Sequence, residues 1–374
     1  MRKPIVLGVG TLCIVGSVMA LSRGWLAPPR PVGDMSYANP SSMAKWPLPG
    51  GKTDTLRPGI THTFAQATDG TQIDFFDFDF KANPKLRFEI FDQDEDDAKP
   101  LDGKVLHLPR NVALATKQLN ARGRGPVVAA WNGAFFGYDF KAGAENSFHV
   151  SPVVLRGKVL YNTANHRWTW GVKQTPQGPV WKTFFKPSRQ IMEREFDYAA
   201  GSVQCLIKDG KPLEVEPFPL IGQGFKPQPV PSSAEEAGHI PSFDHMRTCR
   251  ASIGWSRDNQ HLYLLTVEEP DSENGSNQAL IWAVRGEPIP GNITLTGGWT
   301  VPDLQRFWIS KGVWGAINSD AGSAFQLVYR HPKANYTFLP PRLASEKMRI
   351  EYDPTWKGSF EGGGTIMYFM VREE

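Results

Sequence analysis

Short apolar stretches separated by turn residues dominate the chain, and this pattern predicts a fold rich in β-strands. The stretch 72–80 contains IDFFDFDF, in which apolar and acidic residues take turns as they do along a half-buried strand. Seven further stretches have the length and composition of strands: 86–91, 127–131, 153–160, 261–267, 279–284, 313–317 and 365–371. The 36 Gly and 31 Pro residues agree with the many turns that such a fold needs.

Two stretches instead repeat their apolar residues with the spacing of a helix. The first is 106–121, in which Leu108, Val112, Ala115 and Leu119 share one face. The second is 301–311, which has an apolar stripe and end signals: Thr300 and Asp303 at capping-box spacing, Pro302 in the first turn, the stripe Leu304, Phe307 and Trp308, and Gly312 after the last turn. We therefore predict an α+β fold class, with β-rich mixed sheets and a few helices in a single large domain.

The first 22 residues have the pattern of an export signal. Arg2 and Lys3 precede an apolar run over 4–21, and its end resembles a cleavage site. Such a segment is either removed after export or kept as an N-terminal anchor, so we expect a periplasmic or extracellular protein. Residues 23–56 are rich in Pro, Gly and Ser and are predicted to be a linker, which leaves 57–374 for the folded domain.

Charge and cysteine content narrow the classes of partner. The chain has 41 Lys and Arg against 38 Asp and Glu, a net charge of +3, and no basic run interleaved with aromatic residues. This argues against nucleic-acid binding, and membrane contact is expected only through the N-terminal segment. Cys205 and Cys249 either form a disulfide, as exported proteins allow, or remain two buried thiols.

Three segments share one layout, an apolar run followed by small and polar residues. The first ends in Asn132-Gly133, where the amide could bond a sugar or phosphate and Gly133 allows close approach; a plain hairpin turn is the alternative. In the second, Arg250 enters an apolar strand, where a guanidinium suits phosphate or carboxylate, although a salt-bridged arginine explains it equally. The following strand ends in Glu268 and Glu269, either site acids or a solvated turn.

The third segment places an acid at the end of the strand predicted over 313–317. Asp320 is flanked by small residues that leave room beside its carboxylate, and Gly322 and Ser323 could cradle an anion. Open α/β sheets commonly bind ligands at such strand ends, whereas an Asx-type turn is the alternative interpretation.

Other polar groups give weaker signals. The acidic stretch 92–97 lacks the glycine and glutamate of a calcium loop, so we expect a solvated loop there rather than an EF-hand; bound Ca²⁺ stays an open alternative that no clear loop supports. His149 and His245 have no partner at metal-ligand spacing, and neither a metal nor a cofactor is predicted. Trp168 and Trp170 alternate along one strand, which favours core packing over a sugar platform.

In their order along the chain, these segments resemble the phosphodiester glycosidase family, which includes the mannose 6-phosphate uncovering enzyme and many exported bacterial proteins. The family shows I-N-G-G-F-F, R-T-A-I-G before a strand ending V-D-G-R, and a G-x-T-x-x-E-L helix leading to L-D-G-G-G-S. The corresponding segments here are WNGAFF (131–136), RASIG (250–254), TVEEP (266–270), GWTVPDL (298–304) and NSDAGS (318–323). The resemblance covers about 57–374.

The resemblance implies hydrolysis of the bond between a sugar's anomeric carbon and a phosphodiester. Asn132, Arg250 and Asp320 match polar positions of the family motifs, and Glu268 stands where the V-D-G-R aspartate would be. By this resemblance Arg250 would hold the phosphate, and Asp320 or Glu268 would act as base or nucleophile. Asn132, Gly133, Gly322 and Ser323 would then bind the substrate.

The glycine framework of the family is altered at two positions. Ala134 and Ala321 replace glycines, and the V-D-G-R arginine is absent from VEEP. The hypothesis is therefore an exported glycosidase that acts on a sugar-1-phosphodiester, in a cell-surface polysaccharide for example. The alternative is a glycan-binding or envelope polysaccharide assembly module that uses the same fold without catalysis.

Overall fold

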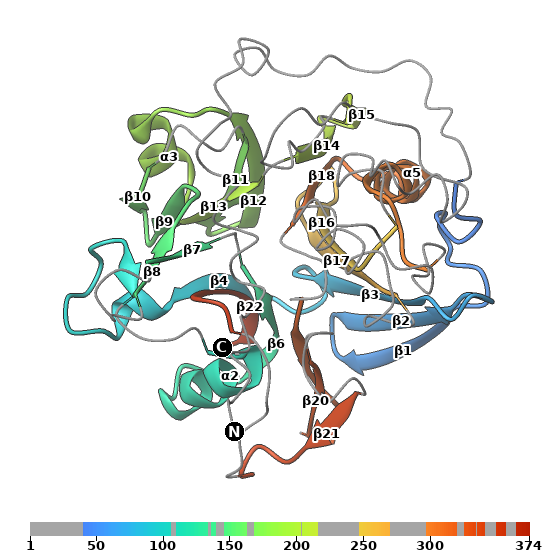
Figure 1. Ribbon diagram of the computed structural model, residues 1–374, viewed down its shortest axis with the longest axis horizontal. Coiled ribbons are helices and arrows are strands. Elements are labelled where there is room, and N and C mark those ends of the chain that lie inside the picture. Colours follow the sequence, from blue (N-terminus) through green and yellow to red (C-terminus); the bar gives the residue numbers. More distant parts are fainter. Residues whose placement is uncertain are drawn as a thin grey trace, which may run out of the picture.

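Strand pairing in the computed structural model organises the chain into antiparallel sheets (Figure 1). The structure describes residues 40–105, 110–133, 136–139, 146–162, 168–202, 204–215, 247–269, 297–319, 325–333, 335–340, 349–356 and 364–374. Across these residues every paired strand runs antiparallel to its neighbour. The α+β, β-rich class predicted from the sequence is confirmed, and the sheets are antiparallel rather than mixed.

The largest sheet has eight strands and carries two of the three predicted motifs. In spatial order its strands are β1 (Lys52–Arg57), β2 (Ile60–Gln66), β3 (Gln72–Asp79), β17 (His261–Glu268), β16 (Arg250–Trp255), β18 (Gly315–Asn318), β14 (Gln204–Lys208) and β15 (Lys211–Pro212). Strand β16 thus lies between β17 and β18, which brings segments far apart in the sequence side by side.

Three further sheets complete the described fold. The six-stranded sheet contains β21 (Ile350–Tyr352), β20 (Tyr336–Leu339), β19 (Leu327–Arg330), β6 (Val127–Asn132), β22 (Met367–Glu373) and β4 (Leu86–Asp92). The five-stranded sheet contains β10 (Lys158–Tyr161), β9 (Val153–Leu155), β13 (Tyr198–Ser202), β11 (Trp168–Thr175) and β12 (Gly178–Phe185). The small sheet contains β5 (Lys104–Val105), β8 (Asn146–His149) and β7 (Phe136–Asp139).

Helices cover the outer faces of these sheets. In Figure 1, α5 (Val301–Lys311) lies against the eight-stranded sheet, α2 (Val112–Ala121) beside β6, and α3 (Arg189–Glu195) at the five-stranded sheet. A short 3₁₀ helix, η3 (Gln93–Glu95), follows β4. None of the described helices is long and apolar enough to cross a membrane.

An aromatic core joins the three large sheets. Phe88 packs against Trp131 of its own sheet and Trp170 of the five-stranded sheet, with ring centroids 6.2 and 5.6 Å apart. Trp131 also lies 6.3 Å from Phe78 of the eight-stranded sheet. Aromatic pairs of this kind add about 0.5–1.5 kcal/mol each to the gain from burial. Separate clusters lie beneath α5 and α2, so the two outer faces are also covered.

The second predicted helix is confirmed at both ends. Helix α5 spans Val301–Lys311 and ends at Gly312. The Thr300 hydroxyl accepts a hydrogen bond from the Asp303 amide, and the Asp303 carboxylate accepts one from the Thr300 amide, 3.1 Å each. This is the reciprocal capping box that the spacing predicts.

Other element boundaries differ from the sequence prediction for local reasons. Helix α2 begins at Val112 rather than Leu106, because Asn111 caps it, and 106–109 lie outside the described residues. The predicted strand 153–160 is a hairpin of β9 and β10, since Arg156 and Gly157 adopt positive φ angles of 49° and 77°. The predicted strand 279–284 lies outside the described residues.

The folded part begins before the predicted boundary at residue 57. Strand β1 occupies Lys52–Arg57, and Met43 and Leu48 are buried beneath α5. The Trp46 ring packs 4.6 Å from the Phe75 ring, and its amide donates to the Ser310 hydroxyl of α5. Residues 40–56, assigned to the linker by composition, therefore pack on the domain.

The core explains four further side chains. Cys205 and Cys249 are buried thiols and form no disulfide, because β18 separates β14, which carries Cys205, from β16, which follows Cys249. Trp168 and Trp170 are both buried, as the interpretation of their alternation as core packing predicts.

Removing the Thr300 hydroxyl should destabilise the protein through α5. We expect Thr300→Ala to lower the free energy of unfolding by about 1 kcal/mol, because the Asp303 amide loses its acceptor in a buried setting. Urea unfolding monitored by tryptophan fluorescence measures this change. Thr300→Ser keeps the hydroxyl and should stay within about 0.5 kcal/mol of the natural chain; equal losses in both variants would contradict the capping role.

Candidate functional site

Arg250 opens β16 and is completely buried on the α5 side of the sheet. Its relative exposure is 0%, and its Nε donates to the carbonyl of Trp299 at 3.0 Å, just before α5 begins. Two residues along the same face, the Ser252 hydroxyl accepts from Trp308 Nε1 of α5 at 2.7 Å. Burying a guanidinium is costly unless it is paired and hydrogen-bonded, so the fold holds this cation at a defined point.

The segment that receives Arg250 depends on a glycine. Gly298 has a φ of +79°, and a Cβ there would lie 2.4 Å from the Thr248 carbonyl oxygen. Trp299 and Thr248 exchange backbone hydrogen bonds of 3.1 and 3.2 Å next to this contact. Gly298 is the first residue of GWTVPDL, so the structure explains why this position of the predicted motif is a glycine.

The side chains of Glu268 and Glu269, at the end of β17, point to opposite faces of the sheet. Val267 is the register partner of Arg250 and packs in the cluster beneath α5. Glu269 is 1% exposed, and its Oε1 lies 3.4 Å from the Thr248 hydroxyl, on the side that Arg250 also faces. Because successive side chains of a strand point to opposite faces, Glu268 turns to the other side. Glu269, rather than Glu268, therefore shares the side of Arg250.

Glu268 instead belongs to a charged cluster around Asp74 of β3, which also includes Arg349 and His62. Its charge, with that of Asp74, raises the pKa of Arg349 against the opposing effect of burial. Arg349 binds Asp74 through Nη1 and Nη2 at 2.8 and 2.6 Å, and His62 Nε2 lies 2.6 Å from the same carboxylate. Arg349 thus ties the β20–β21 end of one sheet to β2 and β3 of the other.

The end of β18 carries a row of buried polar side chains. Asn318 lies between its register partners Gln204 of β14 and Ser252 of β16, and its Nδ2 donates to Gln204 Oε1 at 2.7 Å. The next amide, of Ser319, donates to the Ala251 carbonyl at 3.0 Å, beside Arg250. Asp320, Gly322 and Ser323 follow directly in the chain and lie outside the described residues.

Asn132 and Gly133 lie at the end of β6 in the six-stranded sheet. Asn132 Oδ1 accepts from the Gln326 amide at 3.0 Å, and Gln326 Oε1 accepts from the amide of Val112, the first residue of α2. Gly133 donates its amide to the Met367 carbonyl at 2.8 Å, and a Cβ there would lie 2.8 Å from that same oxygen. The close approach made by Gly133 is therefore to β22.

The predicted residues are thus linked by one short piece of chain. Residues 320–324 connect Ser319, bonded beside Arg250, to Phe325 and to Gln326, bonded to Asn132. Glu268 is on the opposite face of β17 from Arg250. Three buried polar residues not predicted from the sequence lie on the same face of the sheet as Arg250: Gln204, Ser252 and Asn318. Glu269, one of the two acids predicted at the strand end, lies on that side as well. The alternation of side chains along a strand puts Glu269 on the same face as Val267 and Glu268 on the other, and this signal was already present in the sequence.

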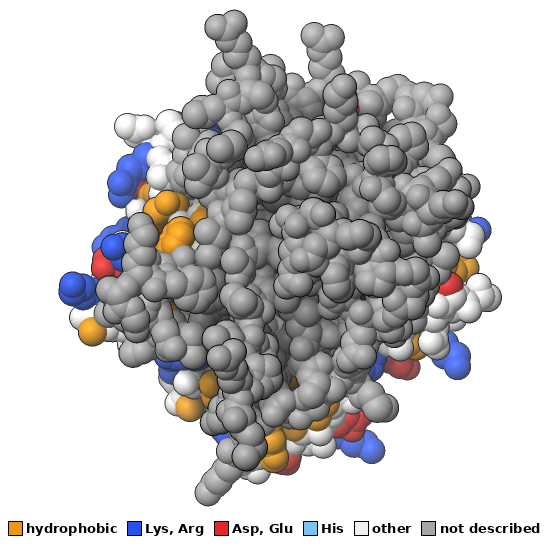
Figure 2. Space-filling view, in the orientation of Figure 1, with side chains coloured by type: hydrophobic (Ala, Val, Ile, Leu, Met, Phe, Trp, Pro, Cys, Tyr) orange, Lys and Arg blue, Asp and Glu red, His pale blue; other side chains and the backbone are white. Residues whose placement is uncertain are grey.

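Neither a surface groove nor a metal cluster adds to these residues. A groove of about 320 Å³ lies between β4, β11 and β13, lined by Arg87, Phe88, Glu89, Arg156, Gln174, Asp197, Tyr198 and Glu374. It contains none of the predicted site residues. Within the described ranges, no three His, Cys, Asp or Glu side chains could hold one metal ion. On the face of the molecule drawn in Figure 2, the described residues are visible mainly around the rim, and there the Lys and Arg side chains are interspersed with Asp and Glu.

The Asp74–Arg349 contact should make stability fall in acid. Burial opposes ionisation of Asp74, but the charge of Arg349 and hydrogen bonds from His62 and Arg349 outweigh it and lower its pKa from 3.8 to about 2. A lowered carboxyl pKa contributes stability that is present above pH 4 and lost as the pH falls toward 2, here about 2 kcal/mol.

Urea unfolding at pH values from 5 to 2 measures this loss. Arg349→Met should flatten the dependence on pH in this window, since the cation that favours ionised Asp74 is gone. Arg87→Met removes a half-exposed cation 3.6 Å from Glu374 and serves as the matched control. The same acid dependence in both variants would exclude the assigned cause.

Comparison with known proteins relates the chain to others by fold. No protein-family model matches the sequence, and no curated protein matches it. One similar structure is the catalytic domain of zebrafish N-acetylglucosamine-1-phosphodiester alpha-N-acetylglucosaminidase (NAGPA), auto-inhibited by its pro-peptide, with a TM-score of 0.47 and 12% identity over 92% of this chain and 97% of that chain.

Two bacterial structures are also similar. A Burkholderia pseudomallei protein assigned as exported has a TM-score of 0.44 and 12% identity, over 88% of this chain and 76% of its own. A hypothetical protein from Synechocystis has a TM-score of 0.42 and 10% identity, over 87% of this chain and 64% of its own. These likenesses concern the fold, and the family resemblance of the motifs stays a prediction.

Proposed function

We propose that this protein is a glycosidase that hydrolyses a sugar-1-phosphodiester. The observation that carries the proposal concerns the residues on either side of 320–324: Ser319 donates to the carbonyl of Ala251, next to Arg250, and Gln326 donates to Asn132. A buried cation and an acid on adjoining stretches of chain suit a substrate that carries a phosphate next to an anomeric carbon.

Each residue has a role that its chemistry allows. Arg250 binds the phosphodiester and stabilises the more highly charged phosphomonoester as it leaves. Asp320 acts on the anomeric side, as a base toward water or as the nucleophile. Glu269, on the side of Arg250, is the second carboxylate in place of Glu268, and a pair of carboxylates is the usual equipment of a glycosidase. Asn132 orients a sugar hydroxyl or a phosphate oxygen.

Export is part of the same proposal. Arg2, Lys3 and the apolar run after them support delivery out of the cytoplasm, with the segment either cleaved or kept as an anchor. A substrate in a cell-surface polysaccharide agrees with that location. Neither a metal nor an organic cofactor is required by the roles given to the residues.

The proposal is tested by incubating the full chain with α- and β-linked sugar-1-phosphodiesters and measuring free reducing sugar. We expect Arg250→Lys, Asp320→Asn and Glu269→Gln each to lower kcat/KM by more than about 100-fold. The two carboxylate variants remove a negative charge at the reacting centre, and Arg250→Lys keeps the positive charge but replaces the bidentate guanidinium with a single ammonium. Arg257→Ala is the matched control, since this exposed arginine stacks on Trp314 at the other end of β16 and should leave the rate unchanged.

The outcomes separate the competing functions. Full activity in both Arg250→Lys and Asp320→Asn would sink the residue assignment, even if sugar is released. Absence of turnover together with saturable glycan binding would favour the non-catalytic binding module. Circular dichroism and thermal unfolding of each variant show whether a lost activity reflects the site or the loss of the fold.

A further inference from the structure

A buried ion pair joins the end of β4 to the end of β8. His149 Nε2 lies 2.9 Å from Asp92 Oδ2, and both side chains are wholly inaccessible to solvent. From the sequence, residues 92–97 are expected to form a solvated loop, and His149 has no partner at metal-ligand spacing. That expectation is wrong for Asp92, Gln93, Asp94 and Asp97, which are buried. Two buried charges are tolerated only when they are paired, and these two groups lie within ion-pair distance of each other.

The pair is held in place from both sides. Asp92 Oδ1 accepts from the Asp94 amide at 2.9 Å, which caps η3. Asp94 in turn accepts from the amides of Asp102 and Gly103 at 3.3 and 2.7 Å, and the His149 amide donates to the Gly103 carbonyl at 3.4 Å. The pair therefore connects two backbone segments that already contact each other through Gly103.

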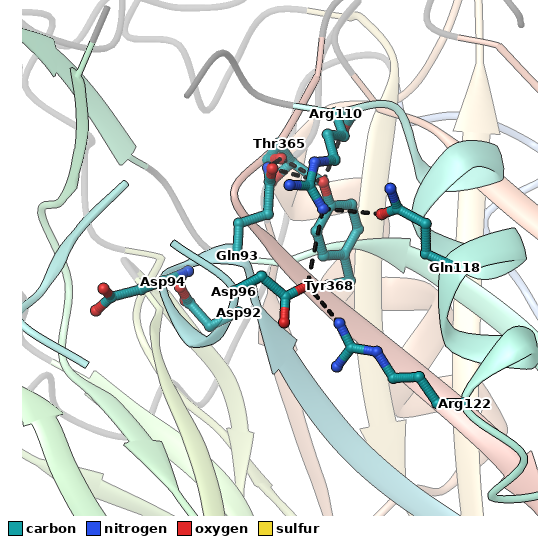
Figure 3. A network of polar contacts seen from close by, with 9 residues as sticks. All are labelled: Asp92, Gln93, Asp94, Asp96, Arg110, Gln118, Arg122, Thr365 and Tyr368. Atoms are coloured by element: carbon teal, nitrogen blue, oxygen red, sulfur yellow. Dashed lines mark hydrogen bonds and ion pairs between the residues drawn. The ribbon is translucent and has the colours of Figure 1, made fainter. Parts of the chain in front are cut away.

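Of the acidic side chains near the pair, Asp96 points away from it and Asp94 faces His149. Figure 3 shows Asp96 turned toward Arg110 and Arg122, while Asp94 extends to the other side. Among the described residues, the groups that face His149 are Asp92, Asp94 and, from β10, the Tyr161 ring at 6.2 Å. Burial lowers the pKa of His149, but Asp92 and Asp94 outweigh it and the pKa is raised. Burial, with the charge of Asp92 adding to it, raises the pKa of Asp94 to about 6.

The pair also closes a ring that includes the first predicted motif. Asp92 is the register partner of Met367 on β22, and the Met367 carbonyl accepts from the Gly133 amide. His149 is the register partner of Phe136 on β7. The ring therefore runs from Asp92 through Met367, Gly133 and Phe136 to His149 and back. Gly133 and Phe136 belong to WNGAFF, whose residues 134–135 lie outside the described residues.

We propose that Asp92 and His149 form a positioning pair, which holds Gly133 and Phe136 in place while His149 is protonated. The pair acts through the backbone of β7 and β22 and does not touch the substrate. Its value for catalysis rests on the proposed function, whereas the positioning itself does not.

The support that the pair gives depends on pH. A histidine with a raised pKa contributes this support fully below pH 6.5 and loses it as the pH rises through that raised pKa. Ionisation of Asp94 above about pH 6 adds negative charge that prolongs the protonated state of His149.

The test is an NMR titration of the full chain from pH 5 to 9, with ¹⁵N-labelled histidine side chains and backbone amides. The signal of His149 is assigned among the eight histidines by its loss in His149→Gln. We expect His149 to titrate above 6.5, and the Gly133 and Phe136 amide shifts to follow the same midpoint. In Asp92→Asn the midpoint should fall by about one pH unit or more, and the shifts at Gly133 and Phe136 should shrink.

The chain supplies a matched control in a second histidine–aspartate pair. His261 Nδ1 lies 2.8 Å from Asp77 Oδ1, between the neighbouring strands β17 and β3, and both side chains are partly exposed. Asp77→Asn should change the titration of His261 and leave Gly133 and Phe136 unaffected.

Three results would overturn the proposal, and none involves a sugar substrate. They are an ordinary midpoint near 6.5 for His149, amides of Gly133 and Phe136 that ignore its titration, or unchanged positions of those amides in a folded His149→Gln variant. His149→Gln keeps a hydrogen-bonding side chain, so it covers the case in which Asp92→Asn does not fold. If turnover of a phosphodiester is found, Asp92→Asn should shift the alkaline limb of the kcat profile, which a merely structural change would leave in place.

Discussion

Phe88, Trp131 and Trp170 meet in a core to which three sheets contribute, and the placement of every motif depends on that shared burial. Phe78 and Phe369 extend the cluster from the eight-stranded and six-stranded sheets. Because these large rings leave water together, the sheets cannot shift relative to one another without exposing them. The ends of β6, β16 and β18 are held accordingly, and with them the polar residues that follow each strand.

Charge burial is the second constraint on this fold. Arg250, Asp74, Asp92 and His149 are all withdrawn from solvent, and each is accommodated by specific contacts. Arg349 joins two sheets through Asp74, and the Asp92–His149 pair joins a sheet edge to a hairpin. Buried pairs add little net stability but are costly to break, so they specify which segments meet.

Local signals predicted the elements whose ends are determined locally. The helix at 301–311 was predicted at both ends, because its cap, its proline and its terminal glycine act within one turn. The hairpin at 153–160 was missed, because the turn at Arg156 uses a positive φ that a non-glycine residue seldom adopts. The acidic stretch after β4 appeared solvated, since its histidine partner lies more than fifty residues away in the sequence.

The sequence by itself determined the β-rich class, the order of the motifs and the residue types at each strand end, since these depend on periodicity and local chemistry. Only the tertiary structure decided that Glu269 rather than Glu268 faces the side of Arg250, that Ser319 is bonded next to Arg250, and that Gln326 is bonded to Asn132. Strand alternation is local, but which face is buried against α5 is not. The pairing of Asp92 with His149 was also decided by the fold, because a contact between residues far apart in the sequence produces no periodic pattern from which it could be predicted.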